Sequence, residues 1–228
     1  MKGKPEARGA RKHRIFLIED HVVFRQGLSW ILAQDKDLEI CGEAGDGVEA
    51  LARLKNARPD VVLIDIGLPG VSGVELTKQI RGMMPKVGLL ILSMHKEALY
   101  AERALRAGAN GYIMKRESGE EVIAAIRKVL AGKIYASKTF NEMILQKVSG
   151  SGREVTAFSM DLITDRELEV FQRVGQGLST RQISEELHIS MKTVEAHREH
   201  IRTKLSLPTN ADLVQHAIHW VHSEKNLD

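Results

Sequence analysis

The sequence has few cysteines, prolines and aromatic residues, and it lacks a long apolar run. Cys41 is its single cysteine, which excludes an internal disulfide and fits a reducing compartment such as the cytoplasm. We expect Cys41 to be a small buried side chain. No apolar run approaches the roughly 20 residues of a membrane span. The apolar residues 15–18 end at Glu19 and Asp20, which excludes the apolar core of a signal peptide.

The net charge of +3 is unevenly distributed along the chain. Residues 1–14 carry +5, residues 15–137 are neutral, and residues 161–228 carry −3. The overall charge therefore gives no argument for nucleic-acid binding. Any such argument must come from the local arrangement of side chains. We interpret residues 1–13 as a disordered basic tail.

The chain from residue 14 to about 136 alternates between short apolar segments and helical segments. Strands are predicted at residues 15–18, 39–41, 61–64, 89–92 and 111–114, and helices at 22–32, 47–56, 74–81, 98–107 and 119–130. Glycine and proline separate most of these segments. Five strand–helix units of this length predict a five-stranded parallel sheet with helices on both faces.

The remainder of the chain has a different pattern. Residues 137–160 are interpreted as a linker, because Ser149 to Gly152 have a flexible composition. Residues 161–228 show only helical periods and predict an all-α domain of four helices. Their expected N-caps and capping partners are Thr164 with Glu167, Ser179 with Gln182, Ser190, and Thr209 with Asp212.

Polar side chains come directly after four of the predicted strands. Glu19 and Asp20 follow the first strand, Asp65 closes the third, Ser93 follows the fourth and Lys115 follows the fifth. The carboxyl ends of parallel strands meet at one edge of a sheet, where ligands bind. We therefore expect these five side chains to converge on one site.

Three carboxylates that converge repel one another unless a cation lies between them, and oxygen ligands favour a hard ion such as Mg²⁺. Beside such an ion and Lys115, a carboxylate can attack phosphorus and form an aspartyl phosphate. The positive charges neutralise the phosphoryl oxygens as the charge shifts. A hydroxyl such as that of Ser93 can then hydrogen-bond the new group.

Four motifs in this part of the chain resemble those of response-regulator receiver domains. They are Glu19-Asp20-His21, Asp65 to Gly70, Ser93, and Gly111 to Lys115. The resemblance covers about residues 14–135, and its specificity comes from the order of the motifs and their strand-end positions. It implies a flavodoxin-like (βα)5 receiver domain over residues 14–136, phosphorylated by a sensor histidine kinase.

The resemblance also implies roles for individual residues. Asp65 is the expected phosphoacceptor. The expected Mg²⁺ ligands are Asp20, Asp65 and the backbone carbonyl of Gly67, with Glu19 assisting through water. Lys115 is expected to pair with the phosphoryl group.

Ser93 and Tyr112 are expected to form a coupled switch pair that responds to phosphorylation. Taken alone, Ser93 also suits an ordinary loop serine, and Tyr112 also suits an ordinary buried aromatic residue. His21 and His95 are interpreted as surface or capping residues rather than metal ligands.

Residues 177–205 have the pattern of a helix, a tight turn and a longer helix. Leu178, Ile183 and Leu187 suit the buried face of the first helix, and Val194, Ile201 and Leu205 suit that of the second. The second helix then presents polar residues outward, and it can enter the major groove of DNA.

Residues 162–218 resemble a LuxR-type helix-turn-helix, through Leu162 to Glu167, Gly177 to Ser179, Lys192 to His197 and Lys204-Leu205. Together with the receiver, this is the NarL/FixJ architecture. The resemblance implies mainly phosphate contacts for Lys192, Thr193, Arg198, Arg202 and Lys204. It implies base contacts for Glu195, Ala196 and Glu199.

The leading hypothesis is a cytoplasmic transcription regulator that phosphorylation switches. We expect phosphorylation to favour homodimers that bind double-stranded DNA at two half-sites, and we expect RNA polymerase as a further partner. In the resting state the receiver is expected to cover or restrain the recognition helix. The last helix, predicted at 211–222, is either a dimer surface or simple core.

Two alternatives differ in class. A haloacid-dehalogenase-like phosphatase also phosphorylates an aspartate, but it needs a second acid where this chain has Gly67. A degenerate receiver that is never phosphorylated conflicts with the intact set of acids and Lys115. We therefore predict no enzyme activity beyond self-catalysed phosphorylation and dephosphorylation of the phosphoacceptor.

Overall fold

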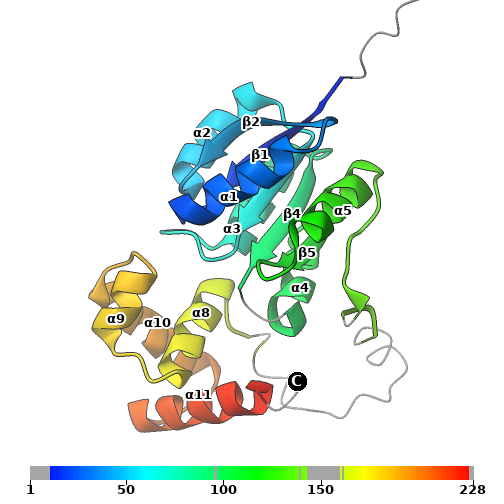
Figure 1. The fold of residues 1–228 in the computed structure, drawn as a ribbon. Helices are drawn as coiled ribbons and strands as arrows, with labels where there is room; N and C mark the ends of the chain where they lie inside the picture. The colour runs from blue at the N-terminus through cyan, green and yellow to red at the C-terminus, as the bar shows by residue number, and fades with distance from the viewer. Residues whose placement is uncertain (1–10, 95–96, 139, 143–159, 161, 226–228) are drawn as a thin grey trace, which may run out of the picture.

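The structure is a computed structural model that describes residues 11–94, 97–138, 140–142, 160 and 162–225 (Figure 1). Its first part is a sheet flanked by helices. The elements in chain order are β1 (His13–Ile18), α1 (Val22–Ala33), β2 (Leu38–Ala44), α2 (Gly47–Ala57), β3 (Val61–Asp65), α3 (Gly73–Met83), β4 (Gly88–Ser93), α4 (Glu97–Arg106), β5 (Gly111–Met114) and α5 (Gly119–Leu130).

The five strands form one parallel sheet in the order β2-β1-β3-β4-β5. Successive strand residues point to opposite faces, so each strand contributes to two cores. Ile15 and Leu17 pack with α1 and α5, whereas Phe16 and Ile18 pack with α2, α3 and α4. This arrangement confirms the flavodoxin-like fold that the sequence predicts.

Local sequence explains where several helices begin. Asp46, Ser72 and Ser118 are N-caps of α2, α3 and α5, and each accepts a hydrogen bond from the backbone N–H of the glutamate three residues later. These bonds satisfy amide groups that have no partner inside the helix. β3 is buried at every position, as expected for a central strand.

The second strand differs from the prediction in length and burial. β2 extends to Ala44 rather than ending at Cys41, and Cys41 is half-buried rather than buried. Gly42 and Glu43 have low strand propensity. They belong to β2, an edge strand, because their backbone pairs with β1. β1 in turn begins at His13, the last residue of the predicted tail.

The second part contains α8 (Asp165–Gly175), α9 (Thr180–Glu186), α10 (Met191–Lys204) and α11 (Asn210–Lys225). These four helices confirm the predicted all-α domain. Both predicted capping boxes, at Thr164 and Ser179, are present. The core of this domain includes Phe171 and Trp220, whose ring centroids lie 5.5 Å apart.

The buried faces of α9 and α10 follow the predicted pattern in part. Ile183, Leu187, Val194 and Ile201 are buried, whereas Leu178 and Leu205 are only partly buried. Leu213, Ala217 and Trp220 of α11 are buried as well, which supports core packing for that side of the last helix.

Most of the predicted tail and linker lies outside the described residues, including residues 1–10 and the glycine–serine stretch 149–152. One described residue of the predicted linker, Phe140, is buried and packs in the same apolar core as α4. The linker therefore has an anchored residue near its start.

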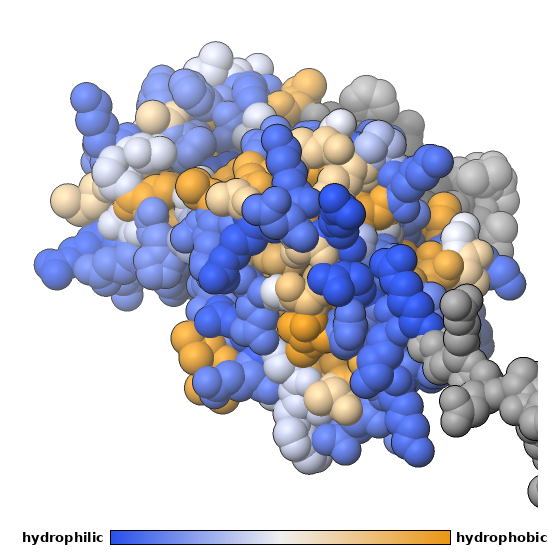
Figure 2. Space-filling model, turned by 90° about the horizontal axis from the view of Figure 1, so that it is seen from above, coloured by the Kyte–Doolittle hydropathy of each residue, from blue (hydrophilic) through white to orange (hydrophobic). Residues whose placement is uncertain are grey.

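Within the described ranges, no helix combines the length and hydropathy of a membrane span. Hydrophilic side chains cover much of the face seen in Figure 2, and apolar areas lie between them. Two exposed apolar side chains, Val23 and Trp30, lie two turns apart on α1.

Candidate functional site

The carboxyl ends of β1, β3 and β5 bring three of the predicted residues into direct contact. Lys115 Nζ lies 2.7 Å from Oε2 of Glu19 and 2.9 Å from Oδ2 of Asp65. Glu19 comes from the loop after β1, Asp65 ends β3, and Lys115 follows β5. The parallel sheet thus joins residues that are up to 96 positions apart in the sequence.

These three side chains are almost completely buried. Glu19 is 1% exposed and Asp65 is 4% exposed. Burial raises the pKa of both carboxyl groups, and their charged neighbours, Asp65 for Glu19 and Asp20 for Asp65, raise it further. Lys115 acts in the opposite direction on both groups. The site is therefore a dense set of acids that one ammonium group partly compensates.

Asp20 and His21 form the outer part of this acidic site. Oδ1 of Asp20 lies 2.8 Å from Nδ1 of His21, and Glu19 accepts a hydrogen bond from the backbone N–H of His21. Glu19, Asp20, His21 and Asp65 each offer one atom suited to metal binding, and these atoms lie within 4.8 Å of one another. The side chain of His21 is 71% exposed, consistent with the predicted surface position.

Two glycines shape the backbone beside Asp65. The backbone N–H of Gly67 donates to the Asp65 carboxylate, and a Cβ on Gly67 would lie 3.8 Å from Oδ2 of Asp65. Gly73, at the start of α3, is packed more tightly. A Cβ there would lie 2.1 Å from the backbone oxygen of Asp65. No sequence pattern marks Gly73, because the close approach of α3 to β3 is a tertiary feature.

Ser93 is the last residue of β4 and Tyr112 is the second residue of β5, and both are buried. The backbone oxygen of Ser93 accepts a hydrogen bond of 2.7 Å from the N–H of Lys115. This bond ties the end of β4 to the loop that carries Lys115. His95 lies outside the described residues.

The helical domain lies against the carboxyl ends of the strands and covers the acidic site. A cavity of about 400 Å³ is lined by Asp20, His21, Asp65, Gly67, Met94 and Lys115 from the sheet domain, and by Arg173, Glu186 and His188 from α8, α9 and the turn after α9. The site is therefore shared between the two domains.

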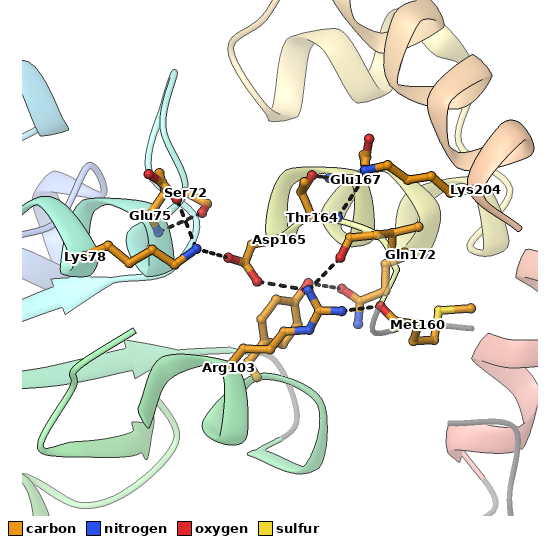
Figure 3. Close-up of polar contacts among 12 residues, drawn as sticks. Ser72, Glu75, Lys78, Arg103, Met160, Thr164, Asp165, Glu167, Gln172 and Lys204 are labelled. Carbon is orange, nitrogen blue, oxygen red and sulfur yellow. Dashed lines mark hydrogen bonds and ion pairs between the residues drawn. The ribbon is translucent and has the colours of Figure 1, made fainter. Parts of the chain in front are cut away.

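Hydrogen bonds and ion pairs join α3 and α4 to the start of α8 (Figure 3). Arg103 of α4 donates to Oδ1 of Asp165 and to the backbone oxygen of Ile163, each over 3.0 Å, and also to the backbone oxygen of Met160. Lys78 of α3 lies 3.8 Å from Oδ2 of Asp165.

A further bond lies deeper in the same interface. The hydroxyl of Tyr100 donates to Oε1 of Gln172 over 3.2 Å, and both side chains are buried. Burial raises the pKa of Tyr100 well above its ordinary value, and the nearby charge of Glu169 adds to that effect. Sequence patterns mark neither Tyr100 nor Arg103, because both have the spacing of ordinary residues of an amphipathic helix.

The residues predicted to contact DNA lie on α10. Lys192, Glu195, Ala196 and Glu199 are exposed, and Thr193, Arg198 and Arg202 are partly exposed. Nη1 of Arg198 donates to the Thr180 hydroxyl over 3.2 Å, and Nη1 of Arg202 lies 3.2 Å from Oε2 of Glu199. This helix therefore presents a mixed surface of cations and acids.

Lys204 also contacts the interior of the helical domain. Its Nζ lies 2.6 Å from Oε2 of the buried Glu167, and this pair lowers the pKa of Glu167 although burial opposes it. His197 and His200 lie near the same carboxylate and complete a second group of metal-suited residues. The Lys204 ammonium already balances the Glu167 charge, so we assign this group a structural role.

Two family models match the chain. The model described as "Response regulator receiver domain" matches residues 15–127, and the model described as "Bacterial regulatory proteins, luxR family" matches residues 161–217. The "Oxygen regulatory protein NreC" of Staphylococcus aureus is 36% identical over 209 residues, which cover 90% of this chain and 96% of that protein.

Solved structures agree with these matches. A LuxR-family two-component response regulator from Aurantimonas sp. is 32% identical, with a TM-score of 0.57, over 60% of this chain and 99% of that one. The RcsB response regulator of Salmonella typhimurium is 19% identical, with a TM-score of 0.64, over 92% of this chain and 98% of that one. At that identity, the likeness to RcsB supports the fold alone.

Proposed function

Because this chain belongs to the two-component response regulators of the NarL/FixJ type, with a receiver domain and a LuxR-type DNA-binding domain, we propose that Asp65 is its phosphoacceptor. One observation carries this assignment: Asp65 ends β3 in a buried pocket, 2.9 Å from Lys115 and beside two further acids. Phosphorylation of Asp65 would then control DNA binding by α10.

The acidic site fits a divalent metal ion of the Mg²⁺ type. Its donor set includes the carboxylates of Glu19, Asp20 and Asp65, and oxygen donors are those that Mg²⁺ prefers. Two buried atoms, Oε2 of Glu19 and Oδ1 of Asp20, have ion-pair neighbours but accept no well-aligned hydrogen bond from the described residues. Asp20, Asp65 and the carbonyl of Gly67 would hold the ion, with Glu19 assisting through water. The bound ion would supply positive charge beside the phosphoryl oxygens.

The side chains of the pocket suit a phosphoryl transfer in which a carboxylate oxygen of Asp65 attacks phosphorus. A new P–O bond forms as the bond between phosphorus and the imidazole nitrogen of the donor, a sensor histidine kinase, breaks. The electron pair of that bond stays on the imidazole. Lys115 pairs with the transferred group, and water later hydrolyses the acyl phosphate and restores Asp65. The protein would thus promote its own phosphorylation and dephosphorylation. Its family consists of transcription regulators rather than classical enzymes.

Ser93 and Tyr112 are proposed to transmit the change from Asp65 to α4. The hydroxyl of Ser93 would hydrogen-bond the phosphoryl group, and the Tyr112 ring would adjust on the same side of the sheet. Tyr112 packs in the same core as Tyr100 of α4, whose hydroxyl contacts α8. We propose that a change at β4 and β5 would reach the domain interface through these packed residues.

The same interface suits a resting state in which the receiver restrains the DNA-binding domain. Arg103 and Tyr100 hold α8, and α8 packs directly against the recognition helix α10. We propose that phosphorylation weakens these bonds and releases the DNA-binding domain. The restraint would act through α8.

On DNA, we propose that the N-terminal half of α10 lies in the major groove, with Glu195, Ala196 and Glu199 near base edges. Phosphate contacts would come from Lys192, Thr193, Arg198, Arg202 and Lys204. Because acids on the same helix reduce the attraction to phosphate, a monomer would bind modestly. A homodimer on two half-sites would double the contacts.

RNA polymerase is a further proposed partner. The free thiol of Cys41 suits a cytoplasmic location.

A direct test is incubation of the full-length protein with acetyl phosphate and Mg²⁺, followed by intact mass measurement. We expect the mass of one phosphoryl group on the wild-type protein and none on Asp65→Asn. A Lys115→Gln variant should gain the group more slowly. Equal mass gain by Asp65→Asn would refute the assignment of Asp65.

A further inference from the structure

Three residues of the DNA-binding domain line the cavity that contains Asp65. They are Arg173 of α8, Glu186 at the end of α9 and His188 in the following turn. Nε of Arg173 lies 3.0 Å from Oε2 of Glu186. The cavity thus contains an ion pair from one domain and a phosphoacceptor from the other.

The guanidinium of Arg173 is held at the cavity by two bonds from its own domain. Besides the bond to Glu186, Nη1 donates to the backbone oxygen of Glu169 over 3.1 Å. Its side chain is 14% exposed, whereas that of Glu186 is 53% exposed. Arg173 is therefore fixed in place, and Glu186 has room to move toward solvent.

Phosphorylation replaces the single negative charge of the Asp65 carboxylate with a phosphoryl group that carries between one and two, so it adds at most about one negative charge to this cavity. Lys115 is already shared between Asp65 and Glu19 before the group arrives. The new charge attracts the Arg173 guanidinium and repels the Glu186 carboxylate. Phosphorylation therefore acts on the two members of the ion pair with opposite signs.

We propose that Glu186 is the residue that makes the closed arrangement of the two domains sensitive to phosphorylation. This inference rests on the proposed phosphorylation of Asp65. Glu186 stays paired with Arg173 and offsets the attraction of that guanidinium to the phosphoryl group, so the repulsion of the Glu186 carboxylate moves the end of α9 away from the receiver. Without that carboxylate, the attraction between Arg173 and the phosphoryl group holds the domains together.

The neighbouring residue Glu185 provides a matched control. Its carboxylate pairs with Arg181 at 2.9 Å on the exposed side of α9 and does not line the cavity. Glu185→Gln removes the same charge from the same helix as Glu186→Gln. A difference between these two variants therefore reports position in the cavity rather than net charge.

The experiment compares the wild-type protein with Glu185→Gln, Glu186→Gln and Glu186→Asp at full length, with and without acetyl phosphate and Mg²⁺. Intact mass gives the phosphorylated fraction, and small-angle X-ray scattering gives the separation of the domains at matched phosphorylation. Wild type, Glu185→Gln and Glu186→Asp are expected to expand on phosphorylation. In Glu186→Gln, phosphorylation should raise the ratio of open to closed molecules about fivefold less than in the wild type. This difference corresponds to about 1 kcal/mol.

An expansion of phosphorylated Glu186→Gln equal to that of the wild type would overturn the inference. So would an equal loss of response in Glu185→Gln, because that result would assign the effect to net charge. The failure of every variant to gain phosphoryl mass would instead refute the proposed function, and this inference would fall with it.

Discussion

Arg103 of the receiver and Asp165 of the DNA-binding domain form a direct ion pair, with Nη1 of the arginine 3.0 Å from Oδ1 of the aspartate. The two side chains are only 17% and 11% exposed, so solvent screens the pair weakly. The same guanidinium also donates to two backbone oxygens just before α8. One side chain of α4 thus connects the receiver to the first helix of the other domain.

Arg103→Ala should release the DNA-binding domain without phosphorylation. A hydrogen bond to a charged group contributes about 1.5–3 kcal/mol, so we expect the open-to-closed ratio to rise by about tenfold or more. Small-angle X-ray scattering of the unphosphorylated protein would detect the expansion. Arg106→Ala is the matched control, since Arg106 is exposed and pairs with Glu102 in its own helix. Equal compactness of Arg103→Ala and wild type would contradict the prediction.

Glu169 should make the stability of the DNA-binding domain depend on pH. Burial raises its pKa to about 7, although Arg166 opposes the shift. The pKa of Glu169 is higher in the folded state than in the unfolded state. The contribution of its protonated form to the free energy of unfolding is therefore complete below about pH 4.5. It is lost as pH rises through 7. Its size is on the order of 1–3 kcal/mol.

The measurement is urea unfolding of wild type and Glu169→Gln between pH 5 and 8. The free energy of unfolding of the wild type should fall toward high pH relative to that of the variant, which keeps a hydrogen-bond acceptor for Arg166 but cannot ionise. A constant difference across this range would show that Glu169 does not titrate there.

Gly73→Ala should destabilise the receiver. The new Cβ would lie 2.1 Å from the backbone oxygen of Asp65, so α3 must shift at a cost of about 1–3 kcal/mol. Gly82 belongs to the same helix, and a Cβ there meets nothing within 4 Å. Gly82→Ala should therefore stabilise the protein by about 0.5–1 kcal/mol. Urea midpoints that move in the same direction for both variants would contradict this pair of predictions.

Lys192→Ala should weaken DNA binding uniformly across sequences. Lys192 is exposed at the start of α10, and loss of one phosphate contact reduces the slope of log affinity against log salt by about 0.9. Fluorescence anisotropy on duplex DNA at several salt concentrations measures this slope. Lys55→Ala, which removes an exposed charge of α2, should leave it unchanged.

The acidic pocket was predictable from sequence because its residues occupy the ends of parallel strands. Once β1, β3 and β5 are placed in one sheet, Glu19, Asp65 and Lys115 have little freedom to lie apart. The starts of several helices were predictable for a similar local reason, since caps such as Thr164 and Ser179 act within four residues. The length of β2 was not, because it depends on pairing with β1.

The domain interface was beyond the reach of sequence patterns. Arg103 and Tyr100 have the periodicity of an ordinary amphipathic helix, and Arg173 and Glu186 have that of ordinary surface residues. Their partners come from a different domain more than 50 positions away, or from a different helix. No local rule of spacing or propensity records such a pairing.

By itself, the sequence determined the order of strands and helices, the acids and lysine at the strand ends and the caps of the DNA-binding helices, because these depend on neighbours along the chain. Only the tertiary structure decided that the second domain covers Asp65 and that α4 holds α8. Those contacts depend on the shapes and charges of two folded surfaces, which exist only after each domain has formed.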